Sequence, residues 1–132
     1  MPTGGSFIVF GRQRNMLDMI RNFMSFFQGE SCGWCVPCRV GNKLLADKLD
    51  KILAGRGTER DLDDLEEWGE MIRATSRCGL GQTSPNPILS SLRHLRGDYE
   101  DRLLDQDFAP AFDLRQAASE ASRIARHPPT YL

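Results

Sequence analysis

Four cysteines are the residues of this chain whose type and spacing point most directly to chemistry. Cys32, Cys35 and Cys38 form a C-x2-C-x2-C motif, and Cys78 follows after 39 further residues. Three thiolates spaced in this way can wrap one corner of an iron-sulfur cube, which leaves the fourth iron for a distant cysteine. The spacing therefore predicts one 4Fe-4S cluster, with Cys32, Cys35, Cys38 and Cys78 as its metal ligands.

Two other kinds of site use the same thiols and stay open as alternatives. Zinc is also held by four thiolates, although zinc sites usually contain two C-x2-C pairs or include His. A zinc-stapled interaction module is the alternative from a different class of protein, and a thiol redox switch is the third. Haem attachment through C-x2-C-H is excluded because Arg39, and not His, follows Cys38.

The residues beside the cysteines fit a cluster. Gly33 lets the backbone fold close to the sulfur atoms, and Pro37 suits the first turn of a helix that begins at the motif. Arg39 and Arg77 adjoin ligands, where they either offset the negative charge of the cluster or are simply solvated. Trp34 either covers the cluster from water or packs against a partner.

The composition describes an ordinary globular chain. Its 132 residues include 17 Lys+Arg and 18 Asp+Glu, for a net charge of −1. The chain therefore has no general positive field that would attract nucleic acid, and a nucleic-acid partner is not expected. The apolar run Phe7 to Phe10 is far too short to span a membrane or to serve as an export signal. Reduced thiols without an export signal predict a cytoplasmic protein with no direct membrane insertion.

Apolar periodicity predicts an all-α fold, a small four-helix bundle that carries the cluster. The expected helices are Met16 to Gly29, about Pro37 to Ala54, a third capped by Thr58, and, after a loop, a fourth with Asn86 as its N-cap and Pro87 in its first turn. Phe23, Val40 and Leu44 are among the residues expected inside. Gly55 is expected to cap the second helix, and Gly97 to break or bend the fourth.

Both ends of the chain are expected to lie outside this bundle. Ser6 to Phe10 reads as a short apolar β-strand without a partner strand in the rest of the sequence. It either pairs with another chain or belongs to a preceding sheet-containing domain. Residues 1–14 are accordingly predicted to be a remnant of that domain or a linker, 15–105 the cluster-binding bundle, and 106–132 a peripheral C-terminal helix, over Leu114 to Arg126, and tail.

The cysteine motifs and their flanks resemble a known family. ESCGWCVPCRVG (Glu30 to Gly41) and SRCGLG (Ser76 to Gly81) resemble the C-terminal iron-sulfur domain of the flavin- and NADH-binding subunit of respiratory complex I and its relatives. PTGGSFIVF (Pro2 to Phe10) resembles the segment that leads into this domain. Trp34 and QTSPNPIL (Gln82 to Leu89) look closer to the diaphorase subunit of bidirectional NAD-linked hydrogenases than to complex I.

The resemblance implies a role in electron transfer. In this family the cluster takes electrons one at a time from reduced FMN, which exchanges a hydride with NAD(H), and relays them to other iron-sulfur centres. The expected function is thus a one-electron relay in an NAD(H)-linked diaphorase, with the equivalent domain of complex I or of an NAD-dependent formate dehydrogenase as the alternative.

The resemblance also implies partners and a division of labour. The expected partners are the FMN- and NADH-binding portion, in the same subunit or in a partner chain, and other iron-sulfur subunits. No Gly-rich phosphate-binding motif of a recognised form occurs in these residues. We therefore assign no catalytic or nucleotide-binding residue here, and we expect that this chain alone does not turn over NADH.

Overall fold

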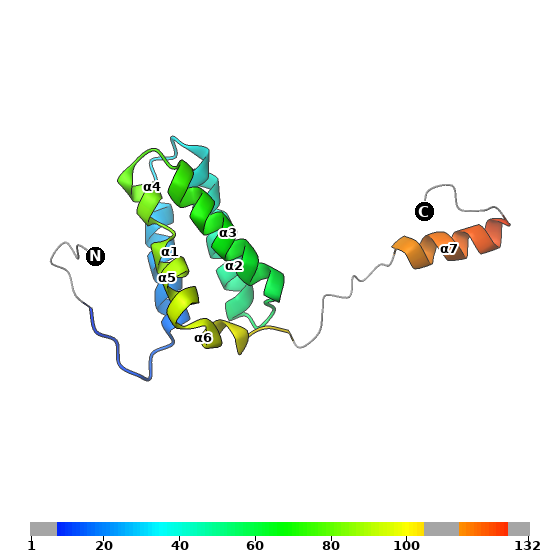
Figure 1. Ribbon diagram of the computed structural model, residues 1–132, viewed down its shortest axis with the longest axis horizontal. Helices are drawn as coiled ribbons and strands as arrows, with labels where there is room; N and C mark the ends of the chain where they lie inside the picture. Colours follow the sequence, from blue (N-terminus) through cyan, green and yellow to red (C-terminus); the bar gives the residue numbers. More distant parts are fainter. Residues whose placement is uncertain (1–7, 105–113, 127–132) are drawn as a thin grey trace.

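The structure is a computed structural model that describes residues 8–104 and 114–126. In these ranges the chain forms helices and no β-strand, which confirms the all-α class, and Figure 1 shows α1 to α6 gathered in one body. The helices are α1 Met16–Gly29, α2 Val36–Leu53, α3 Glu59–Thr75, α4 Gly79–Thr83, α5 Asn86–His94, α6 Arg96–Glu100 and α7 Leu114–Ala125.

Four of these helices, α1, α2, α3 and α5, form the bundle that the periodicity predicts. Along the chain each packs against the next, and α5 returns to lie against α1 (Figure 1). Burying one large apolar side chain stabilises a fold by roughly 1.5–3 kcal/mol, so the helices associate through their apolar stripes. The core consists of Leu17, Ile20 and Met24 of α1, Leu45, Ala46, Leu49 and Ile52 of α2, Leu62, Leu65 and Ile72 of α3, Ile88 and Leu92 of α5, and Tyr99 of α6.

The turn between α2 and α3 follows the signals in the sequence. Gly55 has a φ of +68°, and the N–H groups of Gly55 and Arg56 donate to carbonyls in the last turn of α2. At the start of α3, the Thr58 hydroxyl accepts from the Asp61 N–H while the Asp61 carboxylate accepts from the Thr58 N–H. The two caps end one helix and begin the next within a few residues, so the helices run side by side in opposite directions.

Buried charges also join α2 to α3. Lys48 Nζ donates to Asp61 at 2.5 Å and to Asp64 at 2.7 Å, and Lys51 Nζ donates to the second Asp61 oxygen at 2.5 Å. Asp61 and Asp64 are only 1% and 6% exposed. The Lys48 ammonium lies 5.2 Å from the centre of the Trp68 ring, which adds a cation–π contact.

The connection from α3 to α5 differs from the predicted loop. Residues 79–83 form the short helix α4, and α5 begins at Asn86 with Pro85 as its N-cap, so the prediction of Asn86 as the cap is wrong. Ser84 keeps a helical backbone (φ −56°, ψ −35°), and its hydroxyl donates to the Gly81 carbonyl at 3.0 Å. Because Ser84 is buried and bonded in this way, the chain passes from α4 to α5 almost without leaving helical geometry.

The bend after α5 lies at Leu95, and the prediction that Gly97 breaks the helix is wrong. α5 ends at His94, Leu95 has φ −133° and ψ 32°, and Gly97 lies inside α6. The physical reason is Tyr99, which is wholly buried and whose hydroxyl lies 2.6 Å from Ser91 Oγ. Drawing this ring into the core fixes α6 against α5 and sets the bend.

The predicted β-strand is not formed in the part of it that the structure describes. Residues 8–10 are irregular, and Ile8 and Val9 are 63% and 77% exposed; residues 6 and 7 lie outside the described ranges. A strand needs a neighbour to take its backbone hydrogen bonds, and residues 8–104 and 114–126 supply none. Its pairing elsewhere stays a prediction, as do the domain boundaries at residues 14 and 105.

Three apolar side chains of the predicted helix faces are partly exposed. Phe23, Val40 and Leu44 are 37%, 42% and 42% exposed, so the prediction that they lie inside is wrong for these three side chains. They lie at the edges of the apolar stripes of their helices, and these stripes are wider than the surface that neighbouring helices cover.

In the described parts of the chain, none of the helices combines the length and apolar character that crossing a membrane requires.

Candidate metal centre

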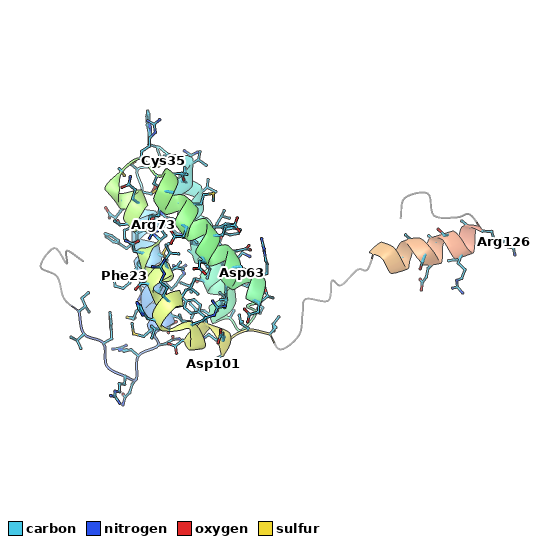
Figure 2. All side chains as sticks on the ribbon, viewed as in Figure 1. Phe23, Cys35, Asp63, Arg73, Asp101 and Arg126 are labelled. Atoms are coloured by element: carbon cyan, nitrogen blue, oxygen red, sulfur yellow. The ribbon has the colours of Figure 1, made fainter. Side chains whose placement is uncertain are left out.

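The four cysteines meet at one end of the bundle. Figure 2 shows Cys35 at the end opposite to Asp101, and Figure 1 places α4 at the same end as Cys35. A hollow of about 140 Å³ is lined there by Cys32, Cys35, Cys38 and Cys78, together with Glu30, Ser31, Trp34 and Leu80. The antiparallel arrangement of α2 and α3 therefore brings Cys78 to the C-x2-C-x2-C motif, as the spacing predicts.

Three of the four thiols are positioned by the first residues of a helix. Cys35 is the N-cap of α2 (φ −101°, ψ 138°), Cys38 lies in the first turn of α2, and Cys78 is the N-cap of α4 (φ −126°, ψ 166°). Pro37 occupies the first turn of α2, where its missing N–H removes no helical hydrogen bond. The free amides at the start of α2 carry partial positive charge, which favours thiolates and an anionic cluster beside them.

Arg39 fixes the loop between Cys32 and Cys35. Gly33 has a φ of +74°, a left-handed conformation that favours glycine, and its N–H donates to Ser31 Oγ at 3.3 Å. The Arg39 guanidinium donates to the Gly33 carbonyl at 2.6 Å. Arg39 is therefore not merely solvated, because it both holds this loop and places a positive charge beside the motif.

The segment that carries Cys78 lies close to α2 because Gly81 has no side chain. A Cβ added at Gly81 would lie 2.6 Å from Ser76 Oγ and 3.2 Å from the Cβ of Cys38. One turn along α2, a Cβ at Gly41 would lie 2.5 Å from the Ile72 side chain. Both glycines are thus needed for close packing, and Gly81 is the one that brings α4 against Cys38.

Backbone amides stabilise the thiolate of Cys35. The pKa of this thiol is lowered from its ordinary 9.0, first by the backbone N–H of Arg77 and next by that of Cys38. The charge of the Arg77 guanidinium acts in the same direction. Because the thiolate is the form that binds metals, these groups prepare Cys35 for ligation and also join the two cysteine segments.

Cys38 is the buried member of the set, and two side chains contact its sulfur. Cys38 is 5% exposed. Asn42 Nδ2 donates to Cys38 Sγ at 3.4 Å, and the Ser31 hydroxyl lies 3.3 Å from the same atom. Asn42 Oδ1 and Ser76 Oγ are buried and have no hydrogen-bond partner among the described residues.

The donor set of the site is four thiols, which both iron-sulfur clusters and zinc ions can use. Thiolates bound to one zinc ion lie about 2.3 Å from it, so their sulfur atoms crowd within about 4 Å of one another. Within the described ranges, no group of three or more Cys, His, Asp or Glu side chains is placed to hold one metal ion. Four thiols that line one hollow are the ligand set that a 4Fe-4S cluster takes.

Sequence reasoning missed the residues that support the sulfur atoms. Ser31 carried no signal beyond its position next to the motif. Asn42 carried one, because it is a polar residue one turn after Cys38 on the buried face of α2. Trp34 lines the hollow yet is 79% exposed, and its predicted roles as a cover or as a partner contact stay predictions.

The sequence places this chain in a family of iron-sulfur modules. Residues 18–102 match the family described as the NADH-ubiquinone oxidoreductase-F iron-sulfur binding region, and the chain belongs to that family. The match begins in the first turn of α1, extends through α6 and includes all four cysteines. It confirms the resemblance that the cysteine motifs and their flanks indicate.

Most of this chain aligns with relatives of known function. It is 45% identical over 119 residues to the NAD-reducing hydrogenase HoxS subunit alpha of Cupriavidus necator, which covers 89% of the chain and 20% of the relative. Identity to the mitochondrial NADH dehydrogenase [ubiquinone] flavoprotein 1 of Dictyostelium discoideum is 34% over 96 residues, which covers 73% of the chain and 20% of the relative. The chain thus spans about a fifth of the length of these relatives.

A solved structure shows the same fold. The crystal structure of an NAD+-reducing [NiFe]-hydrogenase in the H2-reduced state matches with a TM-score of 0.72 and 37% identity. The match covers 92% of this chain and 21% of the hydrogenase chain. The likeness therefore extends over nearly all of the present sequence, while most of the hydrogenase chain lies outside it.

Proposed function

We propose that this chain is a one-electron relay module. It holds one 4Fe-4S cluster through Cys32, Cys35, Cys38 and Cys78, and it carries electrons between FMN and further iron-sulfur centres of an NAD(H)-linked diaphorase. An NAD-reducing hydrogenase is the parent enzyme in this proposal, because the hydrogenase relative is 45% identical and the complex I relative 34%. The equivalent domain of complex I or of a formate dehydrogenase is the alternative.

One observation carries the proposal: four thiols from two distant segments line a single hollow at one end of the bundle. A cluster bound there supplies one-electron redox chemistry. The residues of this chain hold it by their thiolates, place amide dipoles and the charges of Arg39 and Arg77 beside it, and shield its Cys38 side from water. The chain forms and breaks no bond of a substrate.

Metal analysis of the anaerobically purified chain tests the proposal directly. We expect four irons and four acid-labile sulfides per chain, with a brown colour and broad visible absorption that dithionite bleaches. One zinc per chain without sulfide would support the zinc-stapled interaction module instead. A metal-free chain whose thiols form disulfides reversibly would support the thiol switch, and either result would reject the relay.

The nucleotide chemistry of the parent enzyme belongs, in this proposal, to a portion outside these residues. FMN and NAD(H) are bound by the flavin-binding portion of the same subunit or of a partner chain, other iron-sulfur subunits receive the electrons, and the assembly is cytoplasmic. Anaerobic assays of the cluster-loaded chain with FMN, NADH and an artificial acceptor check this division. Turnover above that of free flavin would show a nucleotide site in this chain.

A further inference from the structure

Asn42 is the one buried side-chain amide donor directed at a cysteine sulfur in the described part of the chain. Its Nδ2 lies 3.4 Å from Cys38 Sγ, and the residue is 1% exposed. The bond connects positions four apart on α2, so the helix itself fixes the geometry. The side chain therefore lies behind Cys38, on the core side of the site.

The other half of the same amide makes this position costly. Asn42 Oδ1 is buried and has no hydrogen-bond partner among the described residues, and a buried polar group left unpaired destabilises a fold. A leucine, which has nearly the same shape and no polar atom, would not carry that cost. A buried polar group of this kind calls for a functional explanation, and the sulfur that receives the N–H supplies one.

The backbone at this position has a separate role. The Asn42 carbonyl accepts from Gln28 Nε2 at 3.1 Å, which ties α2 to α1. Because this bond uses the main chain, a change of the Asn42 side chain leaves it in place. The contact to Cys38 can therefore be removed without removing the contact between the helices.

We propose that Asn42 is a positioning residue that sets the reduction potential of the cluster by hydrogen-bonding to the sulfur of Cys38. This inference rests on the proposed function. Reduction adds one negative charge to the cluster and its thiolates, and an N–H directed at a ligand sulfur stabilises that charge. Burial strengthens the effect because the local dielectric constant is low. Asn42 thus raises the midpoint potential and makes the cluster easier to reduce.

Asn42→Leu removes the donor and keeps the volume. In the full chain loaded with iron and sulfide, we expect a normal cluster content and a more negative midpoint potential in a dithionite titration followed by EPR. The expected change is about tenfold in the equilibrium constant for reduction, which is 59 mV for one electron. The matched control is Leu45→Val on the same helix, which we expect to lower the melting temperature without moving the potential.

Each outcome decides the matter. An unchanged potential in Asn42→Leu with a full cluster would overturn the proposal and leave the relay function intact. If Asn42→Leu fails to hold a cluster, the smaller Asn42→Ala is titrated in the same way. Loss of the cluster from both variants, while Leu45→Val keeps it, would make Asn42 an assembly residue and would also overturn the tuning role. Absence of iron and sulfide from the unaltered chain would instead reject the proposed function.

Discussion

The four thiols have different surroundings, and this difference predicts how much each one contributes. Cys38 is buried and contacted by Asn42 and Ser31, whereas Cys32 and Cys78 are exposed. Exposed cysteines have fewer neighbours that hold their side chains in place. Their contribution to cluster binding therefore depends on the backbone that carries them, and for Cys78 that backbone is the start of α4.

Cys78 is expected to be essential although it is distant in sequence. Cys78→Ala removes the one proposed ligand at the start of α4, so we expect the 4Fe-4S content of the reconstituted protein to fall severely, with a three-iron cluster or none remaining. Iron and sulfide analysis together with EPR measures the loss. Thr83→Ala, an exposed position on the same helix, serves as the control and should retain the cluster. A full 4Fe-4S complement with an unchanged spectrum in Cys78→Ala would remove Cys78 from the ligand set.

At the scale of elements, local signals predicted the long helices, and tertiary contacts decided the rest. The start and end of α1, the Thr58 cap and the Gly55 turn all follow from residues within one helical turn. α4 could not be predicted in this way, because a five-residue segment with two glycines has low helix propensity and forms only in its packed setting. The bend at Leu95 likewise depends on the burial of Tyr99, which is not a local property.

The candidate site was predictable to a similar degree. Cysteine spacing is a property of the sequence itself, and it identified all four thiols that line the hollow. The contacts of Asn42 and Ser31 depend on rotamers and on the approach of neighbouring segments, which no spacing encodes. The charged contacts between α2 and α3 were also hidden, because Asp61 and Asp64 resemble solvent-facing residues until Lys48 is placed beside them.

The close approach of α4 to α2 gives a test at this scale. In Gly81→Ala the new Cβ would meet the side chain of Ser76 and the Cβ of Cys38. Overpacking of this kind costs about 1–3 kcal/mol, and the displacement falls on the segment that carries Cys78. We expect a lower melting temperature together with a lower cluster content. Gly79→Ala is the matched control in the same helix, because a Cβ there meets nothing within 4 Å. Equal cluster content in the two variants would contradict the role of Gly81.

The charged contacts between α2 and α3 predict a pH dependence. Burial by itself would raise the pKa of Asp61, but hydrogen bonds from Lys48, Lys51 and Thr58 outweigh it and lower the pKa from 3.8 to about 2. A carboxyl group with a depressed folded-state pKa stabilises the fold above its unfolded pKa. That stabilisation decreases as the pH falls below about 4 and is lost as the pH passes through about 2.

Asp61→Asn isolates this contribution. Urea unfolding of the metal-free chain should show the variant less stable than wild type at about pH 6, with a smaller difference at about pH 3. The exposed Asp63 (Figure 2) provides the control Asp63→Asn, for which we expect little difference at either pH. A gap between wild type and Asp61→Asn that stays constant down to about pH 2 would rule out the linkage.

At the scale of the whole molecule, cluster and fold should be coupled. The motif joins α1 to α2, and Cys78 attaches the end of α3 to the same point, so a bound cluster ties three helices together. The core is continuous without it. We therefore expect the metal-free chain to keep most of its helix but to melt at a lower temperature, because ligands that bind only the folded state stabilise it. Circular dichroism of both forms measures this, and identical melting temperatures would refute the coupling.

The two ends of the bundle differ in their distance from the proposed cluster, so electron exchange with an electrode should depend on which end is attached. The thiols lie at the end where α4 is found, and α6 lies at the other end (Figure 1). At that other end the Leu104 N–H donates to the Gly57 carbonyl at 2.8 Å. Between the two ends lies α2, whose 18 residues extend about 27 Å. That length of protein separates the proposed cluster from the Leu104 end. A molecule tethered to an electrode through its Leu104 end would hold the proposed cluster far from the electrode surface, so we expect little current. Tethering at the Trp34 end would bring the proposed cluster close to the electrode surface, so we expect a larger current.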